Sequence, residues 1–191
     1  PMLLAPAPKR VLVVGLGPGQ TASRFLQYDI EQLDCVEIER ELVPLVRANF
    51  DSAWMEDPRV RFLIEDGRNY LTHTDQRYDV ISVEIGQVFR PGLAAFYTED
   101  FYRRARERLR EDGILAQFLP IGYLTPDQLR VVVRSFLAVF PEALLWYNKS
   151  ELLLVGTNAP RLRLREARLA LLETRAALRD DLAWSQWGGP R

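Results

Sequence analysis

The chain has 191 residues, of which 48% are hydrophobic and 27% are charged, a composition typical of a soluble globular protein with one sizeable core. Its 25 lysine and arginine residues nearly balance 26 aspartate and glutamate residues, and the net charge of -1 gives no argument for nucleic acid or an anionic membrane as a partner. A single cysteine and a single histidine exclude a metal site built from those ligands, and no apolar run approaches the length of a bilayer span.

The first expected strand leads into a glycine-rich turn. Residues 11–14 are apolar and mostly β-branched, which favours a strand buried on both faces. The glycines that follow are Gly15, Gly17 and Gly19. They allow a sharp turn and close approach of a ligand, and a helix expected over residues 21–28 would point its free N–H groups at that ligand. Gln20 stands where a dinucleotide site has its last glycine, and a turn without any ligand is the alternative interpretation.

A second strand, expected over residues 33–39, ends in acidic residues. Glu37 lies about twenty residues beyond the glycine loop, where a carboxylate can accept hydrogen bonds from both hydroxyls of a ribose. The alternative is a solvated charge at the end of a strand. Glu39 suits the positive N-terminal end of the next helix, expected over residues 41–50, and we interpret it as structural.

The third expected strand covers residues 60–64 and is followed by Glu65-Asp-Gly67. At this strand end, Asp66 can accept a hydrogen bond from an exocyclic amine such as the adenine N6, and Gly67 would let the backbone lie close to the base. Asp66 suits the N-cap of a helix over residues 68–71 equally well, and the two roles do not exclude each other.

The fourth expected strand, residues 78–84, ends in Glu84. In an open parallel sheet, ligands bind beyond the carboxyl ends of the strands. The glycine loop, Glu37, Asp66 and Glu84 would therefore meet at one edge of the sheet. Because independent residues do not usually place four such groups at four successive strand ends, this arrangement is the strongest indication of a site in the sequence.

The alternation of helices and strands continues to residue 156. A helix capped by Thr98 is expected to run to about residue 110, followed by a strand over residues 114–119. A further helix begins after Thr125. Residues 143–147 and 152–156 are expected to form a hairpin that places an antiparallel strand at one end of the sheet.

From residue 161 the pattern indicates a basic, amphipathic helix. Its apolar side chains fall near one stripe and are Leu164, Ala167, Leu171, Leu178 and Leu182. Such a stripe is typical of a helix that packs on a domain surface or on a partner. Trp184 and Trp187 are expected to dock on the domain or on a second subunit.

In addition to the glycine loop, six further segments carry a resemblance to a known family. They are Val36-Glu-Ile-Glu39, Asp57-Pro-Arg-Val60, Glu65-Asp-Gly67, Tyr78-Asp-Val-Ile81, Phe96-Tyr-Thr-Glu-Asp-Phe-Tyr102 and Leu109-Arg-Glu-Asp-Gly-Ile-Leu-Ala-Gln117. Together, over residues 9–157, they resemble spermidine synthases and their relatives, the polyamine aminopropyltransferases. The resemblance implies an α/β protein of Rossmann-like class I methyltransferase fold. That fold has a seven-stranded, mainly parallel sheet with an antiparallel strand near one edge and helices on both faces.

The resemblance also implies roles for the residues at the strand ends. In the family, decarboxylated S-adenosylmethionine is held by the glycine loop, by a glutamate matching Glu37 and by an aspartate matching Asp66. An acid matching Glu84 is implicated in deprotonating the attacking amine, which needs a free lone pair. The cofactor-binding residues implied here are Gly15, Gly17, Gly19, Gln20, Glu37, Asp66 and Gly67, with Glu84 as the catalytic residue.

Three departures weaken the assignment of spermidine synthesis itself. Pro18 stands where the family loop carries an aspartate, and Gln87 replaces the second acid of the loop after the fourth strand. The resemblance includes no counterpart of the small N-terminal β-domain that family members place before the glycine loop. The nucleoside side of the site is complete, whereas two carboxylates of the amine side are replaced. Gln117 and Tyr97 are expected, from their family positions, to face the acceptor pocket.

We therefore expect three parts: residues 1–8 as a linker or the edge of the segment, residues 9–158 as a nucleoside-binding catalytic domain, and residues 159–191 as a helical tail. The first functional hypothesis is aminopropyl transfer to a small-molecule amine. The second is methyl transfer from S-adenosylmethionine to another nucleophile, and the third is a catalytically silent binding or assembly domain. We expect a cytoplasmic homo-oligomer, such as a dimer, that needs no metal and binds neither nucleic acid nor membrane through this segment.

Overall fold

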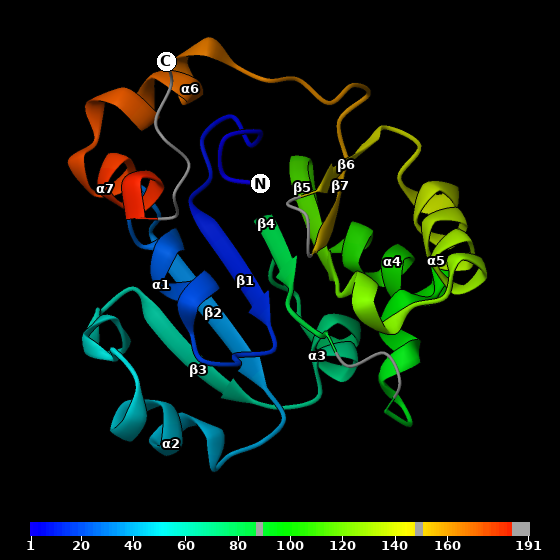
Figure 1. Ribbon diagram of the computed structural model, residues 1–191, viewed down its shortest axis with the longest axis horizontal. Helices are drawn as coiled ribbons and strands as arrows, with labels where there is room; N and C mark the ends of the chain where they lie inside the picture. The colour runs from blue at the N-terminus through cyan, green and yellow to red at the C-terminus, as the bar shows by residue number, and fades with distance from the viewer. Residues whose placement is uncertain (87–89, 148–150, 185–191) are drawn as a thin grey trace.

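A computed structural model describes residues 1–86, 90–147 and 151–184 and contains a seven-stranded sheet with the order β3-β2-β1-β4-β5-β7-β6 (Figure 1). The strands are β1 (Arg10–Val14), β2 (Gln32–Glu37), β3 (Val60–Ile64), β4 (Tyr78–Val83), β5 (Leu109–Leu119), β6 (Ala143–Tyr147) and β7 (Leu152–Thr157). β1 to β5 pair in parallel, and β7 runs antiparallel to both of its neighbours. The predicted mainly parallel sheet with an antiparallel strand near one edge is confirmed.

Helices cover both faces of the sheet, as predicted (Figure 1). The α-helices are α1 (Gln20–Phe25), α2 (Leu42–Asn49), α3 (Gly67–His73), α4 (Glu99–Glu107), α5 (Pro126–Val139), α6 (Glu166–Thr174) and α7 (Ala176–Trp184). The short 3-10 helices are η1 (Ala53–Glu56), η2 (Leu93–Tyr97) and η3 (Ile121–Tyr123). Among the helices of the described ranges, none combines the length and apolar character needed to cross a membrane.

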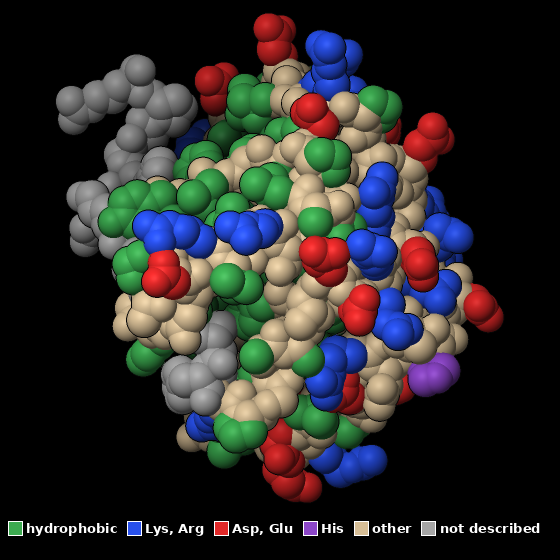
Figure 2. Space-filling view, turned by 90° about the vertical axis from the view of Figure 1, so that its right-hand side faces the viewer, with side chains coloured by type: hydrophobic (Ala, Val, Ile, Leu, Met, Phe, Trp, Pro, Cys, Tyr) green, Lys and Arg blue, Asp and Glu red, His purple; other side chains and the backbone are tan. Residues whose placement is uncertain are grey.

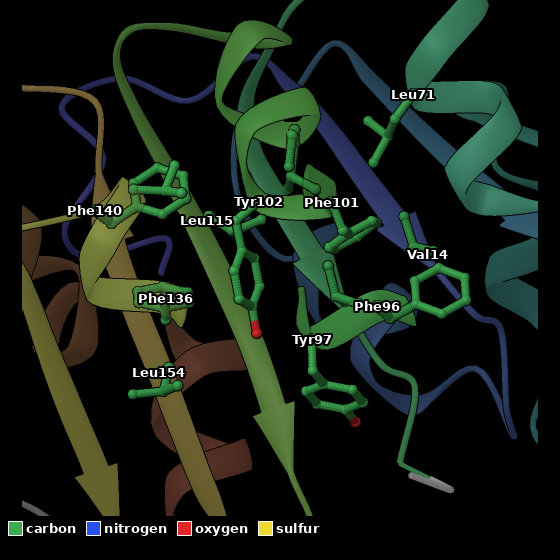
Figure 3. Close-up of a cluster of buried hydrophobic side chains, with 14 of the residues drawn as sticks. Val14, Leu71, Phe96, Tyr97, Phe101, Tyr102, Leu115, Phe136, Phe140 and Leu154 are labelled. Carbon is green, nitrogen blue, oxygen red and sulfur yellow. The ribbon is translucent and has the colours of Figure 1, made fainter. Parts of the chain in front are cut away.

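The alternation of side chains along β1 divides the core into two layers. Leu12 and Val14 face α3, α4 and α5, where aromatic side chains dominate. In Figure 3, Phe101, Tyr102 and Phe136 lie among these side chains, and the rings of Tyr102 and Phe136 meet edge to face at 5.0 Å. Buried aromatic contacts of this kind fix α4 and α5 against the sheet.

The opposite layer is built from Val11 and Val13, the apolar side of α1, and the start of the chain. Met2 and Ala5 are buried in this layer, so the segment that we interpret as a linker packs against the sheet. Cys35 is also buried here, and burial raises the pKa of its thiol to about 12.

Several element boundaries differ from the sequence-based expectation, among them that of α1, which ends at Phe25 rather than at residue 28. α4 ends at Glu107 rather than near residue 110, because Leu109 is buried in the sheet opposite Tyr78 and draws the following residues into β5. The single helix expected from residue 161 is also wrong. The chain is extended before α6, and α6 and α7 are separated at Arg175, whose backbone is extended. Trp187 lies outside the described residues.

The tail therefore does not present one apolar stripe. Leu164 is 61% exposed, whereas Leu178 is 5% exposed and packs inward. On the far side of the sheet, the face around α4 and α5 carries positive and negative side chains that lie interspersed (Figure 2). Arg103 pairs with Glu99 there, and Arg106 donates to the Val139 carbonyl and to Asn158. These contacts pair two of the arginine side chains on α4 with neighbouring polar groups.

Candidate functional site

The carboxyl ends of β3, β2, β1 and β4 lie side by side, which brings the four predicted groups to one edge (Figure 1). Val14 at the end of β1 pairs with Val36 on one side and with Val83 on the other. Backbone hydrogen bonds continue beyond the strands, from Gly15 N to Val36 O at 2.9 Å and from Glu84 N to Val14 O at 2.8 Å. Neighbouring strand ends therefore carry the four predicted groups, which are the glycine loop, Glu37, the segment after β3 and Glu84.

The glycine loop requires glycine for two separate reasons. Gly15, Gly17 and Gly19 have φ angles of 90°, 51° and 80°, a region that other residues rarely adopt. A Cβ atom on Gly19 would lie 2.4 Å from Cζ2 of Trp54, so the loop also packs closely against η1. Gln20 is exposed and is the first residue of α1. The three glycines of the loop thus present bare backbone at the edge of the sheet.

Glu37 fixes the position of this loop. Its Oε2 atom accepts a hydrogen bond from Leu16 N at 2.9 Å, and its Oε1 atom accepts one from Glu39 N at 2.9 Å. The side chain is not solvated, because the residue is only 8% exposed. A carboxylate has about four acceptor positions, so two remain for the hydroxyls of a ribose. The alternative of a solvated, idle charge at a strand end does not hold.

Asp66 is the N-cap of α3, as one of its two predicted roles requires. Its carboxylate accepts from Arg68 N at 2.8 Å, and it also pairs with the Arg68 guanidinium at 2.7 Å. These Arg68 contacts lower the pKa of the Asp66 carboxyl below its ordinary value. Gly67 next to it must be glycine, because a Cβ atom there would lie 2.3 Å from Cγ1 of Val14.

Replacing Asp66 with alanine should lower the free energy of unfolding by about 1 kcal/mol at neutral pH, because the helix cap is lost. The lowered pKa means that Asp66 stabilises the fold above its ordinary pKa and loses this effect as the pH falls. The difference between wild type and D66A should therefore shrink below about pH 4, as urea unfolding at several pH values would measure. Asp75→Ala, at an exposed loop position, is the control and should be neutral. Equal effects of the two substitutions would contradict the capping role.

Glu84 directly follows β4 and lies next to the first turn of α1, which contains Thr21. Its Oε1 atom accepts from Ser82 Oγ at 2.6 Å, and its Oε2 atom accepts from Thr21 Oγ1 at 3.1 Å. Burial raises the pKa of the Glu84 carboxyl, although the hydrogen bonds from Ser82 and Thr21 oppose this effect. A carboxylate that is oriented by two hydroxyls and has a raised pKa is suited to accept a proton.

With this geometry in place, comparison with known proteins identifies the family. The family model described as spermine/spermidine synthase domain matches residues 1–144. The chain belongs to this family. The family's polyamine aminopropyltransferase from Clostridium beijerinckii is 38% identical over 118 residues, and the one from Thermococcus onnurineus is 34% identical over 144 residues. These matches cover 60% and 74% of this chain but 41% and 51% of the relatives, so the chain spans about half the length of the relatives it matches.

Solved structures support the fold of the family. Spermidine synthase from Thermotoga maritima has a TM-score of 0.77 at 22% identity, covering 92% of this chain and 62% of that one. A spermidine synthase in complex with the transition-state analogue AdoDATO has a TM-score of 0.80 at 21% identity, covering 92% and 63%. Human methyltransferase-like protein 13 in complex with SAH has a TM-score of 0.71 at 24% identity, covering 99% and 86%. The class I methyltransferase fold is thereby confirmed.

Some residues of this candidate site were not found from the sequence. Ser82 is detectable in principle, because it lies two residues before Glu84 on the same side of β4. Thr21 and Trp54 have no such local signal, since the fold alone brings Thr21 to Glu84 and Trp54 to Gly19.

Two residues expected at the acceptor pocket lie on the layer that contains α4 and α5. Tyr97 donates to the Ile85 carbonyl, and Figure 3 shows its ring near those of Phe96 and Tyr102. Gln117 is fully buried, and its Oε1 atom has no hydrogen-bond partner within the described ranges. Their role towards an acceptor stays a prediction. Gln87 falls outside the described residues.

Proposed function

We propose that residues 9–158 form the catalytic domain of an aminopropyltransferase that takes decarboxylated S-adenosylmethionine as its co-substrate. The observation that carries this proposal is the convergence of four groups at adjacent parallel strand ends, among them the half-buried Glu84. The membership of the family supports it, as do relatives named polyamine aminopropyltransferase. The acceptor we propose is a small-molecule amine.

The nucleoside part of the co-substrate would lie across the ends of β1, β2 and β3. Glu37 has two acceptor positions left for the ribose hydroxyls, beside the bonds that it makes to the loop. Asp66 would share its carboxylate between Arg68 and the adenine N6 amine. Gly67, which has no side chain, would let the backbone lie close to the adenine base. The backbone of Gly15, Gly17, Gly19 and Gln20 would line the sugar and the sulfonium-bearing chain.

Glu84 would act as the general base. An ammonium group has no free lone pair, so it must give up a proton to the carboxylate before it can attack. The amine nitrogen then forms a bond to the carbon beside the sulfonium, while the carbon–sulfur bond breaks and its electrons neutralise the sulfur. Thr21 and Ser82 keep the carboxylate oriented through this step.

A second candidate is methyl transfer from intact S-adenosylmethionine. Its support is the similarity to human methyltransferase-like protein 13 over 99% of this chain, together with the loss of the family acids at Pro18 and Gln87. A catalytically silent nucleoside-binding or assembly domain is the third. For all three, a cytoplasmic homo-oligomer without a metal and without nucleic acid or membrane partners remains our proposal.

Isothermal titration calorimetry with S-adenosylmethionine, its decarboxylated form and methylthioadenosine tests these candidates directly. We expect the decarboxylated form to bind more tightly than the intact form, because aminopropyl transfer leaves no role for the carboxylate. Tighter binding of the intact form would move the assignment to methyl transfer. Absence of binding for all three at millimolar concentration would leave only the assembly role for this segment.

A further inference from the structure

Helix α1 is too short to hold its own position. It has six residues, and no side chain caps its N-terminus. Isolated helices of this length do not form in water, because the cost of nucleation exceeds the gain from so few hydrogen bonds. The placement of α1, and of the glycine loop that leads into it, must therefore come from contacts with other elements.

One such contact joins α1 to the tail of the chain. The Arg24 Nε atom donates to both carboxylate oxygens of Asp181 on α7, at 3.0 and 2.8 Å. The Nη1 atom of the same arginine lies 3.3 Å from the carbonyl oxygen of Gln20, to which it donates. Arg24 thus connects α7 to the residue that directly follows Gly19 in the loop. Both side chains are about one-third exposed, so solvent screens this pair only in part.

The turn that follows α1 is held in a similar way. Arg175, between α6 and α7, donates to the Gln27 carbonyl at 2.8 Å and pairs with Asp29. A cation at the carboxyl end of a helix satisfies free carbonyls and opposes the helix dipole. Arg168 adds two hydrogen bonds to the Met2 carbonyl and lies 5.8 Å from the ring centre of Tyr28. Figure 1 shows α7 beside α1, on the side away from α4 and α5.

We propose that α6 and α7 form a clamp that positions α1 and the glycine loop for nucleoside binding, with Asp181 and Arg24 as positioning residues. The clamp would also affect Glu84 indirectly, because Thr21 on α1 donates a hydrogen bond to that carboxylate. Both helices lie beyond residue 144, where the match to the family model ends. This inference deepens the proposed function and rests on it for the identity of the ligand.

The test compares Asp181→Asn with Asp180→Asn, which removes the same charge from the adjacent, exposed position. D181N should weaken the binding of methylthioadenosine roughly threefold to tenfold in calorimetry, as expected for loss of a partly buried, charge-assisted hydrogen bond. D180N should leave it unchanged. Arg175→Gln should act in the same direction as D181N through the turn that follows α1. In the double variant R24Q/D181N the effects should not add, because both substitutions break one interaction.

Hydrogen exchange of the backbone amides of residues 19–27 gives a readout that does not depend on the ligand. D181N should speed exchange in this segment at least about tenfold while β1 and β4 stay protected. Equal exchange and equal affinity in D181N and D180N would overturn the clamp. Faster exchange at residues 19–27 in a protein that binds no nucleoside would support the clamp and overturn the proposed function. A fall in melting temperature with uniform exchange over all strands would show a merely structural role and overturn the inference.

Discussion

Replacing Glu84 with glutamine is expected to lower the rate of aminopropyl transfer by about 10²- to 10⁴-fold, the usual contribution of a positioned general base. Glutamine keeps the size of the side chain and an oxygen that can accept from Ser82 or Thr21. It cannot accept a proton from the amine. The measurement is a single-turnover assay that follows methylthioadenosine release in the presence of a diamine.

The control is Glu65→Gln, which removes an exposed carboxylate directly after β3. It should keep the rate within about twofold, since surface charges contribute little. E84Q should also fold at least as well as wild type. Because burial raises the pKa of Glu84 in the folded state, the ionised carboxylate costs stability at neutral pH, and a neutral side chain avoids that cost. Equal rates for E84Q and E65Q would remove Glu84 from the chemistry.

The pH dependence of the reaction provides an independent check. The base must be ionised to act, and the raised pKa of Glu84 moves its loss of charge to a higher pH than that of an ordinary glutamate. As the pH is lowered, the wild-type rate should therefore begin to fall at a pH above the ordinary pKa of glutamate. In E84Q, the remaining slow reaction should lose this limb of the profile.

The position of the site was predictable because it depends on local patterns and one topological rule. Four apolar segments ending in glycine or acid, each followed by a helix, are sufficient to place Glu37, Asp66 and Glu84 at one edge of a parallel sheet. The helix caps at Thr98 and Thr125 were predictable for the same reason, since a cap depends on neighbouring residues.

Contacts between distant segments were not predictable in this way. Trp54 supports Gly19 only because the chain between β2 and β3 folds back beneath the loop. Arg24 and Asp181 are separated by 157 residues, and each is unremarkable in its own sequence context. A periodic pattern also suggests a continuous helix in the tail, whereas the ion pair of Arg175 with Asp29 accompanies a break in it.

The buried charge on β2 illustrates an intermediate case. Asp34 is fully buried within an apolar strand and accepts hydrogen bonds from Tyr78 Oη at 2.6 Å and from the Arg61 guanidinium at 2.9 and 2.8 Å. A carboxylate in a buried strand indicates a partner. Its identity follows only from the register, which pairs Asp34 with Arg61 on β3. The sequence therefore predicts that Asp34 has a partner but does not predict which residue it is.

Replacing Glu37 with alanine is expected to weaken nucleoside binding by about 100-fold or more. Two hydrogen bonds from ribose hydroxyls to a buried carboxylate contribute about 1.5 kcal/mol or more each, and a loss of about 3 kcal/mol corresponds to that factor. The substitution also leaves Leu16 N without its acceptor, which loosens the glycine loop. Calorimetry with methylthioadenosine measures the change, and Glu39→Ala, at an exposed position two residues further on, should stay within about twofold.

A ligand that lacks the ribose hydroxyls separates direct contact from loosening of the loop. Wild type should bind the dideoxy analogue of methylthioadenosine more weakly than the full ligand by the factor that the ribose hydroxyls contribute, and E37A should not distinguish the two ligands. If E37A still favours the full ligand by the same factor as wild type, the hydroxyls bind elsewhere and Glu37 acts only through Leu16. A loss of discrimination in E37A together with its retention in E39A would instead identify Glu37 as the ribose acceptor, since both glutamates lie near the end of the same strand and only Glu37 bonds to the loop.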